Sequence, residues 1–430
     1  MAVEYTGHAC DRYLDRGQVR VAARARAIAG RALHSWGRLN EARDQLIAAL
    51  EVLRTDPDTD TVLVLQDLAR LEVLAGFPDA DRLTAEVMSL GQSLDVGPNL
   101  LSGLFETRGL YHGLGGRRPQ AVAYFRESVR LATLAGDNTR LGRAQINLSD
   151  ALASTDPAAA AEAAQSAVGH LRRTGARSHL AFANGNLTQA LLVLGDWDAA
   201  ERGLTQTADS EELRDYPLLA CYRGLLAALR GDVATAQTML AGLGDLRTSE
   251  DPQMKGFIAL VEASTAAARR QHQEALRHAR DTLAQVGVIG ISGEDQRWAW
   301  PLAARASFEL QDLAAVRELL ALLDSYQPGQ IAPMLRAERD LAHARLAAAD
   351  GDRAAAASFA AAISSLRERG TPYHLAHGLL DHAEYLARDG DADGAAQAIT
   401  EARDVARHLR CPPLLDRADA VEAAPSQIQA

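Results

Sequence analysis

One turn decides the fold of this 430-residue chain: Gly195-Asp196-Trp197-Asp198-Ala199-Ala200. A close copy follows at Gly231-Asp232-Val233-Ala234-Thr235-Ala236, and another occurs at Gly37-Arg38-Leu39-Asn40-Glu41-Ala42. We expect the glycine to end one helix by adopting positive φ. The Asp that follows it can cap the next helix by accepting from unbonded backbone N–H groups. The motif therefore predicts two helices joined by a tight turn.

Weaker copies of this turn fill the rest of the chain. Successive turns lie roughly forty residues apart, which makes about ten units. Glycine opens four of these weaker turns, and other residues occupy the expected place in three: Gly76, Gly116, Gly351, Gly390, Thr155, Arg270 and Gln311.

A second set of breaks runs out of phase with the first and is rich in proline, as at Tyr216-Pro217, Asp251-Pro252 and Gln327-Pro328. We expect proline here to stop the second helix of each unit. A pair of amphipathic helices cannot bury its apolar stripe alone, so neighbouring pairs must stack. The predicted fold is an all-α superhelix, or solenoid, of about ten helix pairs with a period near forty residues, whose concave face is lined mainly by first helices.

Several units resemble the tetratricopeptide-repeat (TPR) superfamily. The resemblance rests on Asn147-Leu148-Ser149-Asp150-Ala151-Leu152, on Asn186-Leu187-Thr188-Gln189-Ala190-Leu191, on Gly109 with Ala121 and Phe125, and on Trp300. The period is longer than the usual TPR unit and approaches the HEAT and armadillo range. These long units, rich in alanine and arginine, resemble the C-terminal sensor arrays of bacterial MalT-like and LuxR-type regulators and of cyclase or ATPase fusions. The resemblance implies protein binding in signal transduction or transcriptional regulation.

The repeat pattern predicts three segments. Residues 1–20 form either a partial repeat, as in an array detached from a longer regulator, or an N-terminal capping helix. Residues 21–412 form the tandem repeats of one superhelix. Residues 413–430 form a C-terminal capping helix and a frayed tail.

Composition excludes several classes of protein. The net charge is −11, and basic residues alternate with acidic ones instead of forming a stripe, so we expect no direct nucleic-acid binding. The only lysine, Lys255, is followed by Gly256, which excludes a P-loop. The cysteines Cys10, Cys221 and Cys411 form no metal or disulfide motif. Without a signal or membrane-spanning segment, a cytoplasmic location is predicted, with no membrane contact and no cofactor.

Polar residues on the first helices of the middle units are the predicted concave binding strip, because asparagine side chains can hold an extended peptide by its backbone amides. The same asparagines could instead join adjacent repeats. Trp298 is added to the strip as an aromatic anchor, provided that Trp300 is the core tryptophan; otherwise both fill the core. The predicted ligand-binding residues are Glu106, Arg143, Asn147, Asp150, Asn186, Gln189, Tyr222 and Trp298.

No catalytic residues emerge from the sequence, and the chain is predicted not to be an enzyme. The preferred hypothesis is an array that binds a protein, a peptide or a small effector; the sequence assigns no oligomeric state. One alternative is a metal-dependent enzyme, because His374, His377 and Asp381 share one helix face and could ligate zinc. We expect no metal there, since histidines on a helix are mostly solvated or bonded to a neighbouring turn. The other alternative is a purely structural scaffold.

Overall fold

The computed structural model describes residues 2–211, 213, 216–249 and 251–423, and these contain helices and turns but no strand. The helices in chain order are α1 (Ala2–Asp15), α2 (Val19–Ser35), α3 (Leu39–Leu53), α4 (Thr59–Ala75), α5 (Ala80–Ser93), α6 (Pro98–Leu114), α7 (Arg118–Ala135), α8 (Asn138–Leu152), α9 (Pro157–Arg172), α10 (Arg177–Leu194), α11 (Trp197–Asp209), α12 (Pro217–Leu229), α13 (Val233–Ala241), η1 (Gly244–Thr248), α14 (Pro252–Ala268), α15 (His272–Leu283), α16 (Val286–Ile289), α17 (Glu294–Glu309), α18 (Leu313–Asp324), η2 (Pro328–Gln330), α19 (Pro333–Ala349), α20 (Ala355–Arg369), α21 (Pro372–Asp389), α22 (Ala392–Leu409) and α23 (Pro412–Ala423).

The chain divides into two compact units. Unit 1 comprises Met1–Ala151 and Gly169–Ala176, and unit 2 comprises Leu152–Val168 and Arg177–Ala430. This division does not test the predicted boundaries after residues 20 and 412, which stay predictions. The helix α23 occupies the place of the predicted C-terminal cap, and the predicted tail from residue 424 onward lies outside the described residues.

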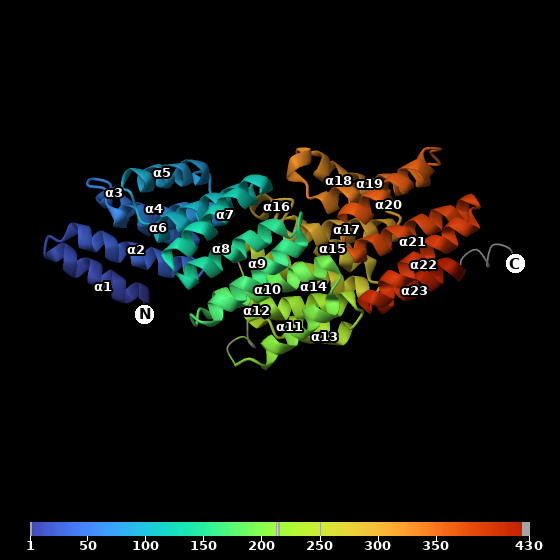
Figure 1. The fold of residues 1–430 in the computed structure, drawn as a ribbon, viewed down its shortest axis with the longest axis horizontal. Helices are drawn as coiled ribbons and strands as arrows, with labels where there is room; N and C mark the ends of the chain where they lie inside the picture. Colours follow the sequence, from blue (N-terminus) through green and yellow to red (C-terminus); the bar gives the residue numbers. More distant parts are fainter. Residues whose placement is uncertain (1, 212, 214–215, 250, 424–430) are drawn as a thin grey trace. The chain divides into compact units, whose positions relative to one another are not determined.

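Within each unit the helices pack as consecutive pairs. In unit 1 the pairs are α2 with α3, α4 with α5 and α6 with α7, and in unit 2 they include α10 with α11, α14 with α15, α19 with α20 and α21 with α22 (Figure 1). The first helices of successive pairs also touch, as α4 touches α6 and α19 touches α21. This arrangement confirms the predicted all-α array of stacked helix pairs.

The tight turns have the predicted geometry. Gly195 and Gly231 have φ values of 84° and 80°. Asp196 accepts from the backbone N–H of Ala199 at 3.1 Å, and Asp232 accepts from that of Thr235 at 3.0 Å, so the predicted caps are present. The turns without glycine are equally informative.

Arg270 and Gln311 stand where most other turns have glycine, and their φ values are 59° and 56°. A side chain with a Cβ is strained in this left-handed region. The repeat geometry is therefore imposed on these two residues by the stacked helices on either side, since their own preferences oppose it.

The prolines of the looser turns also start helices. Pro217, Pro252 and Pro333 each stand at the beginning of the next first helix, where no N–H donor is needed. Pro301 instead lies in the interior of α17, which begins at Glu294. That proline cannot donate to the carbonyl of Arg297, so one helical hydrogen bond is missing there.

Unit 2 folds back onto itself. The turn between α12 and α13 meets the loop before α23, where Cys411 Sγ lies 3.2 Å from the carbonyl of Leu229 and Arg230 Nε donates to that of Leu409 at 3.2 Å. A Cβ on Gly231 would come within 2.9 Å of Pro413. Repeats about 180 residues apart thus pack directly against each other within unit 2.

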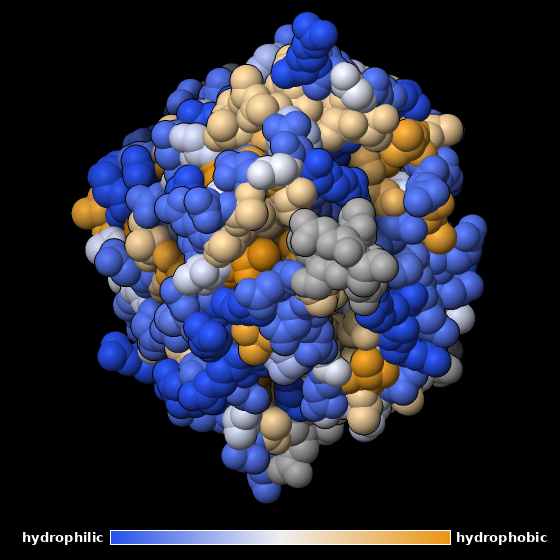
Figure 2. Space-filling view, turned by 90° about the vertical axis from the view of Figure 1, so that its right-hand side faces the viewer, coloured by the Kyte–Doolittle hydropathy of each residue, from blue (hydrophilic) through white to orange (hydrophobic). Residues whose placement is uncertain are grey.

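The surface carries no sign of a bilayer-spanning helix: among the described residues, none is both long and apolar enough. On the face drawn in Figure 2, hydrophilic residues predominate and the hydrophobic ones are scattered between them.

Candidate functional site

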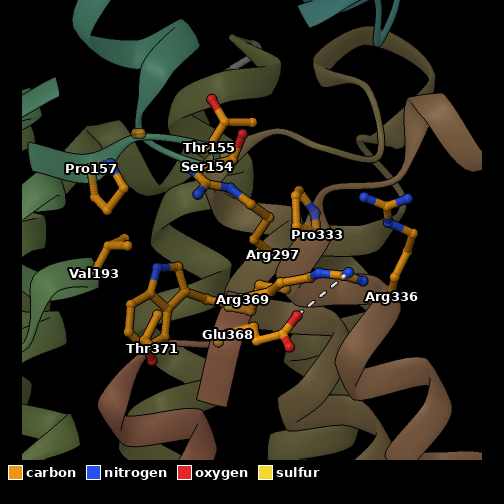
Figure 3. Close-up of a pocket in the computed structure, with 14 residues that line it drawn as sticks. Ser154, Thr155, Pro157, Val193, Arg297, Pro333, Arg336, Glu368, Arg369 and Thr371 are labelled. Carbon is orange, nitrogen blue, oxygen red and sulfur yellow. Dashed lines mark ion pairs between the residues drawn. The ribbon is translucent and has the colours of Figure 1, made fainter. Parts of the chain in front are cut away.

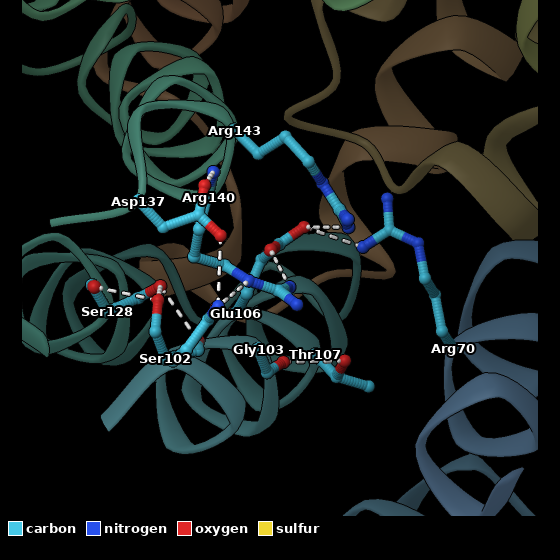
Figure 4. A network of polar contacts seen from close by, with 10 residues as sticks. Arg70, Ser102, Gly103, Glu106, Thr107, Ser128, Asp137, Arg140 and Arg143 are labelled. Carbon is cyan, nitrogen blue, oxygen red and sulfur yellow. Dashed lines mark hydrogen bonds and ion pairs between the residues drawn. The ribbon is translucent and has the colours of Figure 1, made fainter. Parts of the chain in front are cut away.

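A buried carboxylate organises the first helices of unit 1. Glu106 on α6 is 0% exposed and accepts from Arg70 Nη1 on α4 at 2.7 Å and from Arg143 Nη2 on α8 at 2.9 Å. Arg140 Nη1 lies 3.6 Å from the other oxygen of Glu106. Figure 4 shows the arginines converging on Glu106. A Cβ on Gly103 would come within 2.8 Å of Arg140, so this glycine leaves room for the guanidinium.

The charges of this cluster compensate one another. Burial alone would raise the pKa of Glu106, but the charges of Arg143, Arg70 and Arg140 outweigh it and hold that pKa at about 2. Burial lowers the pKa of Arg70 despite the attraction of Glu106. Glu106 is therefore ionised at neutral pH, and three arginines surround a single carboxylate.

Unit 2 contains a similar arrangement of a buried carboxylate and two arginines. Asp381 on α21 accepts from Arg345 Nη1 on α19 at 3.1 Å and from Arg417 Nη2 on α23 at 2.5 Å. As in unit 1, the two arginines come from the preceding and the following first helix. We call an acidic residue held in this way a carboxylate bridge: Arg70–Glu106–Arg143 is the unit 1 bridge, and Arg345–Asp381–Arg417 is the unit 2 bridge.

The unit 2 bridge takes up the residues of the hypothetical zinc site. Asp381 is engaged by its two arginines, and Arg417 Nη1 lies 3.1 Å from His377 Nδ1. His374 is fully buried, with Nδ1 2.7 Å from Thr371 Oγ1. The described residues contain no group of three or more His, Cys, Asp or Glu side chains arranged to hold a metal ion. This geometry gives the metal-enzyme alternative no support.

The predicted concave strip is only partly brought together. Glu106 and Arg143 meet in the unit 1 bridge, while Asn147 is half-buried and Asp150 is exposed on the same helix as Arg143. Glu106 cannot offer its carboxylate to a ligand from solvent, because it is fully buried and already bonded.

The strip residues of unit 2 also differ in accessibility. Asn186 is half-buried, whereas Gln189 and Tyr222 are buried. Tyr222 donates to Glu294 Oε2 at 2.6 Å across 72 residues of sequence, so its hydroxyl is engaged inside the enclosed unit. Whether any strip residue contacts a ligand stays a prediction.

Trp298 is not the exposed anchor that the sequence suggested. Its side chain is 5% exposed and lies against His374, with ring centroids 5.0 Å apart. Trp300 is 0% exposed and donates from Nε1 to the carbonyl of Leu319 at 2.9 Å, which confirms it as a core residue. Trp298 is packed against Tyr373 and His374 from a distant repeat, a contact that the repeat pattern does not reveal.

Trp298 instead forms part of the wall of a cavity. The cavity lies within unit 2, has a volume of about 370 Å³, and is shown in Figure 3. Its wall comes from the turn before α9, from α10, α17 and the start of α19, and from the connection between α20 and α21. The lining residues are Ala153, Ser154, Thr155, Pro157, Val193, Arg297, Trp298, Pro333, Met334, Arg336, Glu368, Arg369, Gly370 and Thr371.

Positive charge exceeds negative charge in this wall. Arg297, Arg336 and Arg369 line the cavity together with a single acidic residue, Glu368, whose Oε2 lies 3.6 Å from Arg369 Nη2. Arg297 is only 3% exposed. Arg336 Nε is buried and makes no hydrogen bond within the described structure. The wall thus presents guanidinium groups and few acidic groups to a ligand.

Sequence reasoning missed all three cavity arginines. Arginine is frequent along the whole chain, and these three stand on three different helices, α17, α19 and α20, so no spacing marks them as a group.

No protein-family model matches the sequence, and no curated protein matches it either. Solved structures match it in fold. A Rap protein complexed with Competence and Sporulation Factor is similar with a TM-score of 0.50 and 11% identity over 91% of this chain and 99% of that one. The apo quorum sensor NprR from B. thuringiensis (TM-score 0.41, 11% identity, 94% and 97% covered) and yeast Tom70 (0.39, 13%, 99% and 96%) are less similar. The fold is that of TPR-like helical-repeat proteins.

Proposed function

We propose that this protein is a non-catalytic TPR-like binding array whose ligand occupies the cavity of unit 2. The cavity itself is the observation that carries the proposal. A volume of about 370 Å³ lies within the usual range of small-molecule sites, and its wall combines an indole and aliphatic side chains with a few charged groups. The occupant is a small effector or a short part of a peptide or protein partner.

Binding here would act on the array as a whole. The wall joins residues from Ser154 to Thr371, so a single ligand touches repeats that are distant in sequence. A ligand that prefers one arrangement of these repeats shifts the population toward it. The array is therefore a sensor or interaction module, in keeping with the resemblance of its units to the sensor arrays of bacterial transcriptional and signalling regulators. The Rap protein of similar fold is itself complexed with a factor, so this kind of array can hold a partner.

The test is a thermal-shift screen of small molecules and short peptides against the purified chain and two matched variants. Val193→Phe adds an aromatic ring at a lining position, whereas Leu194→Phe changes the next residue, which is 39% exposed and does not line the cavity. We expect a compound that stabilises the wild type and Leu194→Phe but not Val193→Phe, because bound ligand stabilises the folded state.

Two outcomes would contradict the proposal. In one, the screen yields no stabilising compound. In the other, every stabilising compound acts equally on both variants, which would place the binding outside the cavity.

A further inference from the structure

We propose that the cavity of unit 2 recognises an anion: a small ligand in which a phosphate or carboxylate group is attached to an apolar ring or chain. The inference rests on the proposed function and names the chemistry of the ligand. It is built from the charges, the helix ends and the apolar wall of the cavity.

The charges favour an anion. Three arginines and one glutamate line the cavity, and Glu368 lies close only to Arg369 among them. Arg336 thus brings positive charge into a partly enclosed space, where burying a charge is costly unless an opposite charge accompanies it. Arginine is also the side chain best shaped to hold phosphate or carboxylate through two parallel hydrogen bonds. Nε of the Arg336 guanidinium is buried, and no described residue accepts a hydrogen bond from it.

The N-terminal ends of three helices add to the positive electrostatic potential in the cavity. Pro157, Pro333 and Thr371 stand at the N-terminal ends of α9, α19 and α21, and all three line the cavity. The N-terminal end of a helix carries partial positive charge and unbonded N–H groups. Thr371 is already used as the cap of α21, accepting from the N–H of His374 at 3.2 Å. By contrast, α19 has no side-chain cap, and its second residue, Met334, faces the cavity.

The rest of the wall is apolar and suits a ring or a short chain. Trp298 offers an indole that is held in place by Tyr373 and His374, whose ring centroids lie 6.0 and 5.0 Å away. Val193, Pro157, Pro333 and Met334 supply aliphatic surface. At about 370 Å³ the cavity lies near the lower end of the usual range for ligand sites, so the ligand is small.

Calorimetric titration of the full chain tests the inference with defined probes. Phenyl phosphate and phenylacetate each join one anionic group to one ring, and benzyl alcohol is the uncharged counterpart. We expect the two anions to bind, the alcohol to bind at least tenfold more weakly, and added sodium chloride to weaken anion binding. The relative affinity of the two anions shows whether the site is built for phosphate or for carboxylate.

Two variants on the same helix locate the site. Arg336→Gln removes the charge of a lining residue and should weaken binding of the preferred anion roughly tenfold. Arg339→Gln is the control, because Arg339 pairs with Asp324 and Asp340 and does not line the cavity. The control should bind like the wild type.

The outcomes separate this inference from the proposed function. If benzyl alcohol binds as well as the anions and Val193→Phe abolishes its binding, the cavity is a ligand site but the anion inference is wrong. If neither anion binds, or if Arg336→Gln binds them like Arg339→Gln, the inference is also wrong, and the compound screen with Val193→Phe still decides the proposed function independently.

Discussion

The buried carboxylate of Glu106 lies 2.7 Å from Nη1 of Arg70, although the two residues are 36 positions apart in the chain. That separation is about one repeat, so the contact joins equivalent helices of neighbouring pairs. Asp381 makes the same kind of contact with Arg345, also 36 positions away. The carboxylate bridges thus join first helices in both units.

Replacing the central carboxylate of the unit 1 bridge should strongly destabilise the folded protein. Glu106→Gln keeps the size of the side chain but leaves the buried arginines without a counter-charge, which costs about 3 kcal/mol in the free energy of unfolding. Glu41→Gln is the control, because Glu41 pairs with Arg38 at an exposed position and such pairs contribute less than about 1 kcal/mol. Urea unfolding followed by circular dichroism measures both. Equal losses in the two variants would mean that the unit 1 bridge does not stabilise the fold.

The contribution of Glu106 should also depend on pH in a defined window. Its pKa is about 2 in the folded protein and 4.5 for an ordinary glutamate, so the folded state favours the ionised form. The resulting stability is fully present above pH 4.5 and is lost as the pH falls toward 2. The stability difference between the wild type and Glu106→Gln should be constant from pH 7 to pH 5 and should shrink by pH 3. A difference that already shrinks between pH 7 and pH 5 would refute the assignment.

Glu338 should behave in the opposite way. Burial raises its pKa to about 7, although Arg305 opposes the shift. Because the folded state favours the protonated form, the stability from this group is present below pH 4.5 and is lost as the pH rises through 7. Glu338→Gln stays neutral at every pH, so its stability relative to the wild type should increase between pH 5 and pH 8. Urea midpoints at the two pH values measure this, and a decrease would contradict it.

Glycine in the tight turns should matter most where the chain folds back. Gly231→Ala places a Cβ both in the left-handed region and within 2.9 Å of Pro413, whereas Gly351→Ala has the same backbone conformation with nothing within 4 Å. The strain of a Cβ in the left-handed region costs each variant about 1–2 kcal/mol of stability. Only Gly231→Ala adds a steric clash. Thermal unfolding should therefore show the larger loss for Gly231→Ala. Equal losses would argue against the close packing of the α12–α13 turn on the loop before α23.

The turns without glycine offer a gain in stability. Arg270→Gly should stabilise the fold by about 1 kcal/mol, because glycine adopts the observed φ of 59° without strain. Arg269→Gly is the matched control, since Arg269 has a φ of −85° and glycine there brings only extra freedom to the unfolded chain. Melting temperatures should move in opposite directions for the two variants. A decrease for Arg270→Gly would show that its side chain makes a contact worth more than the strain.

Local patterns were enough to predict the elements of this protein. The helix end at Gly195 and the cap at Asp196 depend on residues only a few positions apart, so the local motif predicts both. The recurrence of the motif along the chain predicts the stacked helix pairs. Trp300 as a core residue follows from its place in the repeat. Pro301 does not mark the start of a helix, because it lies inside α17.

The candidate site depended on contacts that no local pattern contains. The sequence picked out Glu106 and Arg143 as polar residues on first helices, and Asp381 as a possible metal ligand. It did not reveal which arginines contact the two carboxylates, because these partners stand about a repeat away, where arginine is too common to be a signal. For Trp298 the sequence left open an exposed anchor or a core residue. The structure shows it buried, because it contacts Tyr373 and His374 from a distant repeat.

The amino-acid sequence by itself determined the helices, their turns and the stacking of pairs, because helix ends and apolar stripes are set by neighbours within one or two turns of chain. Two features came only from the tertiary structure: the α12–α13 turn packs against the loop before α23, and Arg297, Arg336 and Trp298 line one cavity. The physical reason is that small differences in packing between successive pairs add up over many repeats, so the meeting of distant repeats depends on the whole stack.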